Sequence, residues 1–573
     1  MMRRMTNVQP GGSLPVWDTA TLRRIERDAA SDLPPHSLMQ RAGDAISRLV
    51  RARFPHARQV SVLCGPGNNG GDGLVAAADL VRHDVQVSVW MVACGAPTDW
   101  QSAVRPADWL WALRLAHSAG LRPLPWTHDA ATSAWDGVDL ILDALLGIGL
   151  NRAPEGELAA AMTALARHSA PVLAVDLPSG LASATGTAPG DLVRAEVTLT
   201  LLGLKPGLLT GPDIHACGEL WLDDLDAWGE PGDSATSQQR RFAAGFPAPQ
   251  GTLPEQSSGS ETLTPEPHTH ATAMLLSAAD AIAALPQPGS AAHKGERGDV
   301  LIFGGATGMT GAALLASRAA LALGAGRVFT ALLDPQAPSF DPAGPELMLR
   351  KPQAMLEMAQ HAPTREGRCC VVFGPGAGMS AEALSILQAL LALDQPLVID
   401  ADGLNLLAGQ ARDGVLWQAL RQRHSPTWLT PHPREAAGLL QWTTTQVQAD
   451  RLSAARTLST LSRAHCVLKG AGSLMTTPDG AMWINSSGNG LLATAGSGDV
   501  LSGALAACIA PTRDPNAAIA AARAAVWLHG AGADLAREEG QGLRAGTLPD
   551  AMVRARTRVK GLSVSLGRTL HRA

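Results

Sequence analysis

The chain has 573 residues, of which 46% are hydrophobic and 17% are charged, and its formal net charge is −5 at pH 7. This composition is sufficient to bury a sizeable core, so it excludes general disorder. The acidic excess argues against a nucleic-acid-binding protein, because such proteins usually present a net basic face to the phosphate backbone.

The first residues, MMRRMTNVQPGGSLPVWD, carry positive charge, but no apolar segment follows them, so we expect no signal peptide. No run of 18 apolar residues occurs, and we therefore expect no membrane-spanning helix and a cytoplasmic protein. The seven cysteines are odd in number and form no CxxC pair. This pattern favours reduced, mostly buried cysteines over a zinc site or a disulfide framework.

In the N-terminal part, short aliphatic runs alternate with Ala- and Leu-rich stretches. We expect strands at Gln59–Cys64, Val85–Val92, Leu140–Asp143, Val172–Asp176 and Val197–Leu202. Helices between successive strands predict a parallel sheet covered on both faces. In such a fold, ligands bind at the carboxyl ends of the strands.

The first unusual motif, GPGNNGGDG, follows the strand expected at Gln59–Cys64. Its glycines match G-x-G-x-x-G, a pattern typical of Rossmann dinucleotide sites. Asn68, Asn69 and Asp72 weaken that interpretation, since a carboxylate beside a pyrophosphate costs Coulomb energy unless a cation lies between them. Asn and Asp oxygens suit a hard cation or a polar ligand, and a tight turn with a helix cap is the structural alternative.

Two further strand ends carry oxygen ligands. Asp143 ends one strand and is followed by the loop Gly147–Ala153, whereas Asp176 ends another and Ser179 lies just beyond it. A single Asp at a strand end is most often a helix cap. Three such ends together favour a ligand-binding cleft.

GPGNNGGDG, DALLGIGL and VDLPSG together resemble the epimerase half of the bifunctional NAD(P)H-hydrate repair enzymes, over about Leu14–Trp228. In that family the substrates are the hydrates NADHX and NADPHX, which have gained water at nicotinamide C6, and this half interconverts their R and S epimers. The resemblance implies that Asp176 is the catalytic acid/base and also contacts the substrate. It implies further substrate contacts by Asn68, Asn69, Gly70, Gly71, Asp72, Gly147, Ile148, Gly149, Leu150, Asn151, Arg152 and Ala153. It also implies a potassium ion bound by Asn69, Asp143 and Ser179. Lys205 also lies near a strand end, where a role in the site and a position in solvent are equally expected.

The segment Gly229–Thr272 separates this part from the rest, because 26 of its 44 residues are Gly, Pro, Ser, Thr or Gln. Such a composition predicts a flexible linker. We therefore expect domains at 1–228 and 273–573, joined by a linker at 229–272.

The C-terminal part shows the same alternation, with strands expected at Asp299–Phe303, Arg327–Ala331, Cys370–Phe373, Leu397–Asp400, Thr427–Thr430, Cys466–Lys469 and Ala481–Ile484. The overall prediction is an α/β protein with two doubly wound α/β/α domains. Four segments of this part carry polar or glycine-rich ends. They are Gly374–Gly378, Asp400 with Asp402, His432 in TPHPRE, and the turn after Val467 in VLKGAGS.

Near the C-terminus, the residues Ala495–Gly498 precede Asp499 in ATAGSGDVLSG. Backbone N–H groups of this loop at a helix N-terminus would form an anion hole, and Asp499 would take a proton from a hydroxyl group that is being phosphorylated. A glycine turn with an Asp cap is the structural alternative. No GxxxxGK[ST] sequence occurs, so no Walker-type nucleotide site is predicted.

Together these segments resemble the ribokinase-like dehydratase half of the same enzymes, from about His293 to Leu548. The resemblance implies that ADP, more than ATP, phosphorylates the C6 hydroxyl of the S epimer in a magnesium-dependent reaction, releasing phosphate and AMP as NAD(P)H is restored. It places Ala312, Gly378, His432 and the catalytic Asp499 at the hydrate. It places Lys469, Gly470, Ala471, Gly472, Ser473 and Gly498 at the nucleotide. Members of the family often assemble, so a homo-oligomer is an open expectation for this chain.

Two residues depart from the family pattern. Arg434 replaces the usual Gly of TPHPGE, which would strain the loop if it needs a positive φ there, and Gly490 stands where proline is common. Three alternative functions stay open. They are a vitamin-alcohol kinase of the ribokinase-like class, a non-catalytic N-terminal binding module, and an NAD-dependent dehydrogenase based on G-x-G-x-x-G alone.

Overall fold

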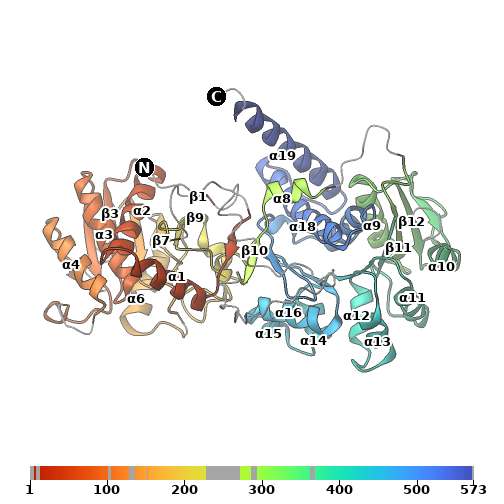
Figure 1. The fold of residues 1–573 in the computed structure, drawn as a ribbon, viewed down its shortest axis with the longest axis horizontal. Helices are drawn as coiled ribbons and strands as arrows, with labels where there is room; N and C mark the ends of the chain where they lie inside the picture. The colour runs from red at the N-terminus through yellow and green to blue at the C-terminus, as the bar shows by residue number, and fades with distance from the viewer. Residues whose placement is uncertain are drawn as a thin grey trace, which may run out of the picture. The chain divides into compact units, whose positions relative to one another are not determined.

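The computed structural model describes residues 6–7, 13–100, 105–127, 135, 137–150, 152–227, 271–285, 293–361 and 368–570, with the backbone alone at 6–7 and 560–570. It divides into two compact units, the first mainly before Leu275 and the second mainly from Leu275 onward (Figure 1). The predicted linker lies outside the described residues except at Ala271 and Thr272. None of the described helices combines the length and the hydropathy needed to cross a bilayer.

The first unit alternates strands and helices. Its described strands are β1 (Thr6–Asn7), β2 (Pro15–Val16), β3 (Gln59–Cys64), β4 (Gln86–Met91), β5 (Leu124–Pro125), β6 (Leu140–Ala144), β7 (Val172–Val175), β8 (Val197–Leu201) and β9 (Glu219–Asp223). Its helices are α1 (Thr19–Ser31), α2 (Ser37–Arg53), α3 (Asn68–Arg82), α4 (Ala107–Ser118) and α6 (Gly156–Arg167), with 3-10 turns η1 (Pro97–Asp99), η2 (Pro206–Leu208) and η3 (Ile214–Cys217).

The main sheet of this unit has the order β1-β9-β8-β7-β6-β3-β4-β5. Its strands pair in parallel except for the short β1, which is antiparallel to β9. Alternate strand residues pack on opposite faces: Val62 joins a core with α2, α3 and α4, whereas Leu63 joins a core with α6. Helices therefore cover both faces, as the sequence predicts.

Helix α3 lies very close to the sheet, which fixes its first turn beside the strand ends. A Cβ atom on Gly73 would lie 2.6 Å from Cβ of Ala144 on β6, so a larger residue does not fit at this crossing. Consequently the predicted loop residues Asn68 and Asn69 begin the helix itself, and they lie at the carboxyl end of β3.

The second unit has a longer series of elements. Its strands are β10 (Ala273–Leu275, at the unit boundary), β11 (Asp299–Gly304), β12 (Arg327–Leu332), β13 (Met348–Arg350), β14 (Cys369–Phe373), β15 (Leu397–Ile399), β16 (Thr427–Leu429), β17 (His465–Leu468), β18 (Leu474–Thr476) and β19 (Met482–Ile484). Its helices are α8 (Ala278–Ala283), α9 (Thr310–Ala322), α10 (Pro352–His361), α11 (Ala381–Leu391), α12 (Asp402–Ala408), α13 (Val415–Gln422), α14 (Pro433–Leu440), α15 (Thr444–Ala449), α16 (Arg451–Ser462), η5 (Gly490–Leu492), α17 (Ser497–Ile509), α18 (Pro515–Glu538) and α19 (Leu548–Leu570).

The strands of this unit follow the order β13-β12-β11-β14-β15-β16-β17-β18-β19. Those from β13 to β17 are parallel, whereas β18 is antiparallel to both β17 and β19. The expectation of a purely parallel sheet is therefore wrong at this edge. The cause is local, since only five residues, Lys469–Ser473, link β17 to β18, and a link this short can join only antiparallel strands.

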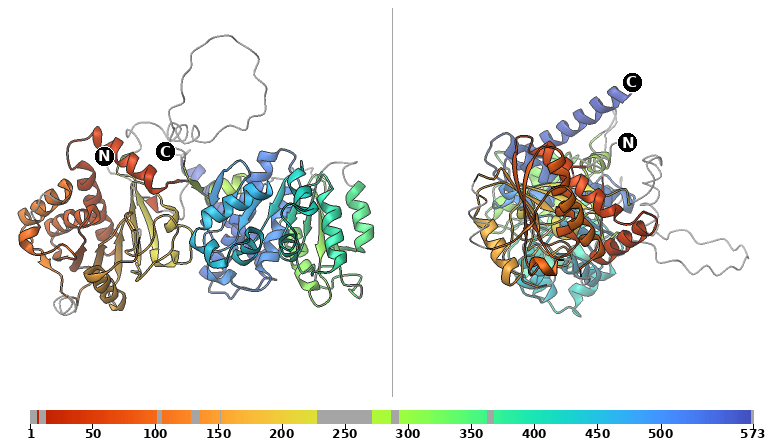
Figure 2. Two further views of the ribbon diagram at one scale, coloured as in Figure 1. Left: turned by 90° about the horizontal axis from the view of Figure 1, so that it is seen from below. Right: turned by 90° about the vertical axis from the view of Figure 1, so that its left-hand side faces the viewer.

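One face of this sheet packs against α8, α9, α17, α18 and α19 in a single large core (Figure 2). Helix α17 crosses α9 closely, since a Cβ atom on Gly503 would lie 1.9 Å from the Ala316 carbonyl oxygen. This crossing holds the N-terminus of α17 at the carboxyl edge of the sheet. All seven cysteines are free and buried, as the sequence analysis expected.

Candidate active sites

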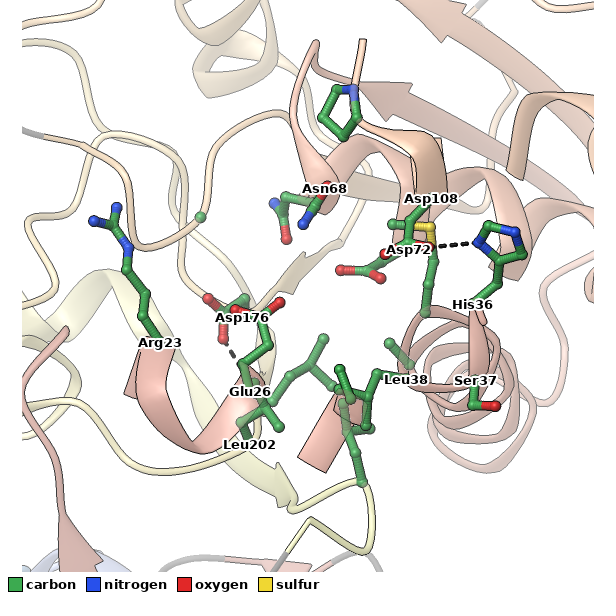
Figure 3. Close-up of a pocket in the computed structure, with 18 of the residues that line it drawn as sticks. Arg23, Glu26, His36, Ser37, Leu38, Asn68, Asp72, Asp108, Asp176 and Leu202 are labelled. Carbon is green, nitrogen blue, oxygen red and sulfur yellow. Dashed lines mark hydrogen bonds and ion pairs between the residues drawn. The ribbon is translucent and has the colours of Figure 1, made fainter. Parts of the chain in front are cut away.

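A pocket of about 630 Å³ opens in the first unit at the ends of β3, β6 and β7 (Figure 3). Six predicted substrate-binding residues line it: Asn68, Asn69, Asp72, Gly147, Ile148 and Asp176. Six others in the described residues do not: Gly70 and Gly71 are buried within α3, and Gly149, Leu150, Arg152 and Ala153 are not part of its lining. Asn151 lies outside the described residues.

Asp176, a buried residue of the pocket lining, is held in an unusual backbone conformation. Its φ is 69°, which a residue other than glycine adopts only at an energetic cost, and such strain clusters at functional sites. Its Oδ1 accepts hydrogen bonds from the ammonium group of Lys205 and from the Leu201 N–H at 3.2 Å. Its Oδ2 would lie 3.4 Å from a Cβ atom on Gly147, so this second oxygen faces the glycine loop.

Lys205 is buried and not solvated, with 2% of its surface exposed. Besides the ion pair with Asp176, its Nζ donates to Thr200 Oγ1 and to the Leu201 carbonyl, each at 2.8 Å. Burial lowers the pKa of Lys205, and the Asp176 carboxylate opposes that effect. The lysine therefore fixes the orientation of Asp176.

Two further carboxyl groups, those of Asp72 and Glu26, line the same pocket as Asp176 (Figure 3). Burial, and then the charge of Asp176, raise the pKa of Asp72 well above its usual value. The same two causes, in the same order, raise the pKa of Glu26 on α1. The pocket thus combines a lysine-paired carboxylate with acids that tend to retain their protons, an arrangement suited to proton transfer.

The three predicted potassium ligands are joined by short contacts. Ser179 donates to Asp143 from its hydroxyl at 2.6 Å and from its N–H at 2.8 Å. Asn69 Nδ2 donates to the Leu146 carbonyl at 3.0 Å, and the Leu146 N–H donates to Ser179 Oγ at 3.0 Å. Burial raises the pKa of Asp143 to about 6, and among the described residues no cationic side chain pairs with it. A buried carboxylate with neutral oxygen neighbours fits a hard monovalent cation.

In the second unit, α17 begins at the predicted glycine loop. Gly496 is the residue before the helix, with φ of 87°, and Asp499 lies in the first turn. Burial raises the pKa of Asp499 to about 7, and the carboxylates of Asp400 and Asp402 add to this rise. A carboxyl group that titrates near neutral pH is suited to general base catalysis.

The segments predicted to contact the nucleotide meet at the end of β17. Lys469 Nζ lies 2.8 Å from Asp400 Oδ1 and 3.8 Å from Glu435 Oε2. It would also lie 3.2 Å from a Cβ atom on Gly498, so the Lys469–Ser473 turn adjoins the start of α17. Backbone N–H groups at a helix N-terminus and in a glycine turn have the chemistry to bind an anion.

His432 has a structural role in addition to the predicted one. Its Nδ1 accepts hydrogen bonds from the N–H groups of Arg434 and Glu435, both at 3.1 Å, so it caps α14. The other ring nitrogen, Nε2, lies 3.3 Å from Oε1 of Glu435 on the same helix. Burial and the charge of Lys469 lower the pKa of His432. Arg434 lies in the first turn of α14 without a positive φ, so the substitution for Gly introduces no strain.

Gly378 and Ala312 adjoin the same group of carboxylates. The Gly378 N–H donates to Asp402 Oδ2 at 2.8 Å, and Ala312 lies near the same loop, since its Cβ is 3.1 Å from a Cβ atom built on Gly376. Between the two acids, Ala401 has φ of 47°, a second strained backbone position. Gly378, Lys469 and Asp499 thus lie around one cluster of carboxylates.

Comparisons with known proteins identify the family. Residues 35–207 match the family described as YjeF-related protein N-terminus, and residues 300–556 match the family described as NAD(P)H-hydrate dehydratase. The bifunctional NAD(P)H-hydrate repair enzyme of Escherichia coli (strain K12) is 34% identical over 525 residues, covering 91% of this chain and 89% of its own. The chain belongs to the bifunctional NAD(P)H-hydrate repair enzymes. The resemblance seen in the motifs is thereby confirmed.

Other members of this repair family are similarly close. The enzyme of Gloeobacter violaceus is 36% identical over 511 residues, covering 88% of this chain and 89% of its own. A crystal structure of the ADP/ATP-dependent NAD(P)H-hydrate dehydratase of Bacillus subtilis, co-crystallised with ATP and Mg²⁺, is 29% identical. It covers 49% of this chain and 96% of that one, with a TM-score of 0.41.

Several pocket residues carry no sequence signal that we recognised. Arg23 and Glu26 come from α1. His36 precedes α2 and Asp108 lies in the first turn of α4, and His36 Nδ1 is 2.5 Å from Asp108 Oδ1 (Figure 3). None follows a strand or a glycine loop. The only available signal is the three-residue spacing of Arg23 and Glu26, which places both on one face of a helix.

Proposed function

We propose that the first unit epimerises NADHX and NADPHX and that the second unit dehydrates the S epimer at the expense of a nucleotide. The observation that carries this proposal is that both family matches occur on one chain, each over the unit that holds the corresponding polar site. Damage at C6 yields both epimers, and a dehydratase specific for one of them therefore needs an epimerase.

In the first unit, we assign the acid/base role to Asp176, with Asn68, Asn69, Asp72, Gly147 and Ile148 around the hydrate. Lys205 and Leu201 hold Oδ1 of Asp176, which leaves Oδ2 to exchange a proton with the C6 hydroxyl. The raised pKa of Asp72 makes it the partner that donates a proton. A base and an acid in one pocket are what the reversible opening of the C6 hemiaminal requires.

We assign Asn69, Asp143 and Ser179 to potassium. The support is the chemistry of the donors, since Asp143 is fully buried and its described neighbours are neutral oxygen and nitrogen groups. A bound cation would neutralise this carboxylate and hold the Leu145–Gly147 backbone beside Asp176.

In the second unit, Asp499 takes the proton of the C6 hydroxyl, and the hydroxyl oxygen then attacks the terminal phosphoryl group of the nucleotide. The N–H groups at the start of α17 and the Lys469–Ser473 turn receive the phosphates. Loss of phosphate from C6, with a proton from C5, forms the C5–C6 double bond of NAD(P)H. With ADP as donor, the products include AMP, and we expect ADP to be preferred.

Magnesium fits this site as a companion of the nucleotide. Mg²⁺ in such sites is usually held by one or two carboxylates together with phosphate and water oxygens. Among the described residues, no group of three or more His, Cys, Asp or Glu side chains is arranged to hold a metal ion by itself. The phosphates therefore supply ligands that the described side chains lack.

The test uses a mixture of R and S NADH hydrate, with ADP and ATP in separate reactions containing Mg²⁺. The return of NADH absorbance is followed, and the remaining epimers are resolved by chromatography. Full conversion of both epimers with one nucleotide supports both activities and identifies the donor. Conversion that stops when the S epimer is used up contradicts the epimerase activity of the first unit. If neither ADP nor ATP yields NADH, the result favours a vitamin-alcohol kinase instead.

A further inference from the structure

A buried guanidinium group lies directly beneath the Lys469–Ser473 turn. Arg451 is the first residue of α16, and only 1% of its surface is exposed. Burying a charge is costly unless the charge is paired or well hydrogen-bonded. Among the residues that the structure describes, Arg451 forms no ion pair with a carboxylate, and Cys466 is the only acidic group that affects its pKa.

The guanidinium group instead binds the backbone that forms the turn. Its Nη2 donates to the carbonyl groups of Leu468 at 3.3 Å and Lys469 at 3.2 Å, and its Nη1 donates to Gln448 Oε1 at 2.9 Å. Gly470 follows at φ of +139°, and a Cβ atom there would lie 2.8 Å from Nη1. The turn therefore rests on the guanidinium group, and glycine is required at the point of contact.

No carboxylate in the described part of the chain pairs with the charge of this group. Burial lowers the pKa of Arg451 to about 10, so the group stays protonated at neutral pH. Lys469, on the other side of the turn, is already paired with Asp400 and Glu435. Arg451 is consequently the cation at this turn that no described carboxylate contacts, and its charge favours an anion on the open side of the turn.

We propose that Arg451 is a positioning residue of the nucleotide site, which fixes the Lys469–Ser473 turn and supplies a positive charge that the phosphates of bound ADP or ATP neutralise. The proposal rests on the proposed dehydratase function. Because Arg451 is buried, it acts on the nucleotide through the turn and its charge, and not by direct contact.

The test compares ADP and adenosine binding by titration calorimetry in the full-length protein and in R451M, R451K and R456M. Arg451→Met removes the charge at similar length, Arg451→Lys retains it, and Arg456 is an exposed arginine of the same helix. We expect R451M to bind ADP about 10-fold or more weakly, because a unit charge is lost from a low-dielectric position near the phosphates. Adenosine affinity should change less than about threefold, R451K should recover most of the ADP affinity, and R456M should match the wild type.

The results separate a role in phosphate binding from a purely structural one. Unchanged ADP affinity in R451M, an equal loss for adenosine and ADP, or no recovery in R451K would overturn the proposal. If R451M does not fold, as judged by circular dichroism, R451Q takes its place, since it keeps hydrogen-bond donors without the charge. If the wild type binds neither ADP nor ATP, the nucleotide-dependent function itself fails, which is a distinct outcome.

Discussion

Replacing Asp499 by Asn should abolish dehydration and at the same time stabilise the second unit. The two effects have one cause, because burial disfavours the ionised carboxylate that the reaction needs as its base. Asn has nearly the same shape and carries no charge, so it removes the base and the electrostatic penalty together. We expect the dehydration rate to fall by at least about 100-fold, the lower end of typical general base contributions.

The stability effect has a defined sign and pH range. The pKa of Asp499 is about 7 in the folded protein, against the ordinary Asp value of 3.8 in the unfolded chain. Between these values the folded state binds more protons than the unfolded state, so wild-type stability falls as pH rises, by about 1.4 kcal/mol per pH unit. The full penalty above pH 7 reaches at most about 4 kcal/mol, and the advantage of D499N should grow by about 2 kcal/mol between about pH 5.5 and pH 8.

The assay is scanning calorimetry of wild type, D499N and D413N at both pH values, with the second-unit transition identified by its shift on adding ADP. Asp413 is an exposed carboxylate of the same unit and serves as the matched control. A D499N variant that is no more stable at pH 8 than at pH 5.5, relative to wild type, would refute the burial argument. A D499N variant that retains more than about a tenth of the dehydration rate would refute the role of Asp499 as base.

Three further predictions address the other features of the chain. D176N should lower epimerisation by at least about 100-fold while leaving dehydration of purified S hydrate unchanged, as followed by chromatography of the epimers. Replacing potassium by a larger organic cation, or Asp143 by Asn, should slow epimerisation and leave dehydration unchanged; equal activity without potassium would contradict the ion site. G490P should raise the free energy of unfolding by about 0.4–1 kcal/mol. Gly490 is the first residue of η5 and follows an extended Asn489, which is a backbone position that proline favours, and a Cβ atom added there would have no neighbour within 4 Å. A lower melting temperature in G490P would show that the backbone there does not accept proline.

Sequence patterns were sufficient for most of the fold because strands and helices in α/β proteins carry strong local signals. The strand expected at Gln59–Cys64 has those bounds in the structure, and the one expected at Val85–Val92 is found at Gln86–Met91. The antiparallel β18 was missed because its three residues, Leu474–Thr476, are too few for a periodic pattern. Its direction follows from the tight turn before it, Lys469–Ser473, whose sequence is also typical of a ligand-binding loop.

The candidate sites were predictable where a polar side chain stands at a strand end or beside a glycine loop. Asp143, Asp176 and Asp499 stand next to glycine loops, which is why their positions could be recognised. Lys205 and Arg451 could not be assigned in this way, because their importance comes from burial and from partners distant in the sequence. Burial depends on the assembled sheet, and no local motif encodes it.

The most direct test of the account uses purified R NADH hydrate as the only substrate, with Mg²⁺ and ADP. If both activities reside in this chain, NADH forms faster than the uncatalysed epimerisation allows, because the first unit supplies S hydrate to the second. D499N then equilibrates R with S hydrate without producing NADH. Formation of NADH limited to the uncatalysed rate, in a preparation that dehydrates S hydrate, would contradict the claim that both activities reside in this chain.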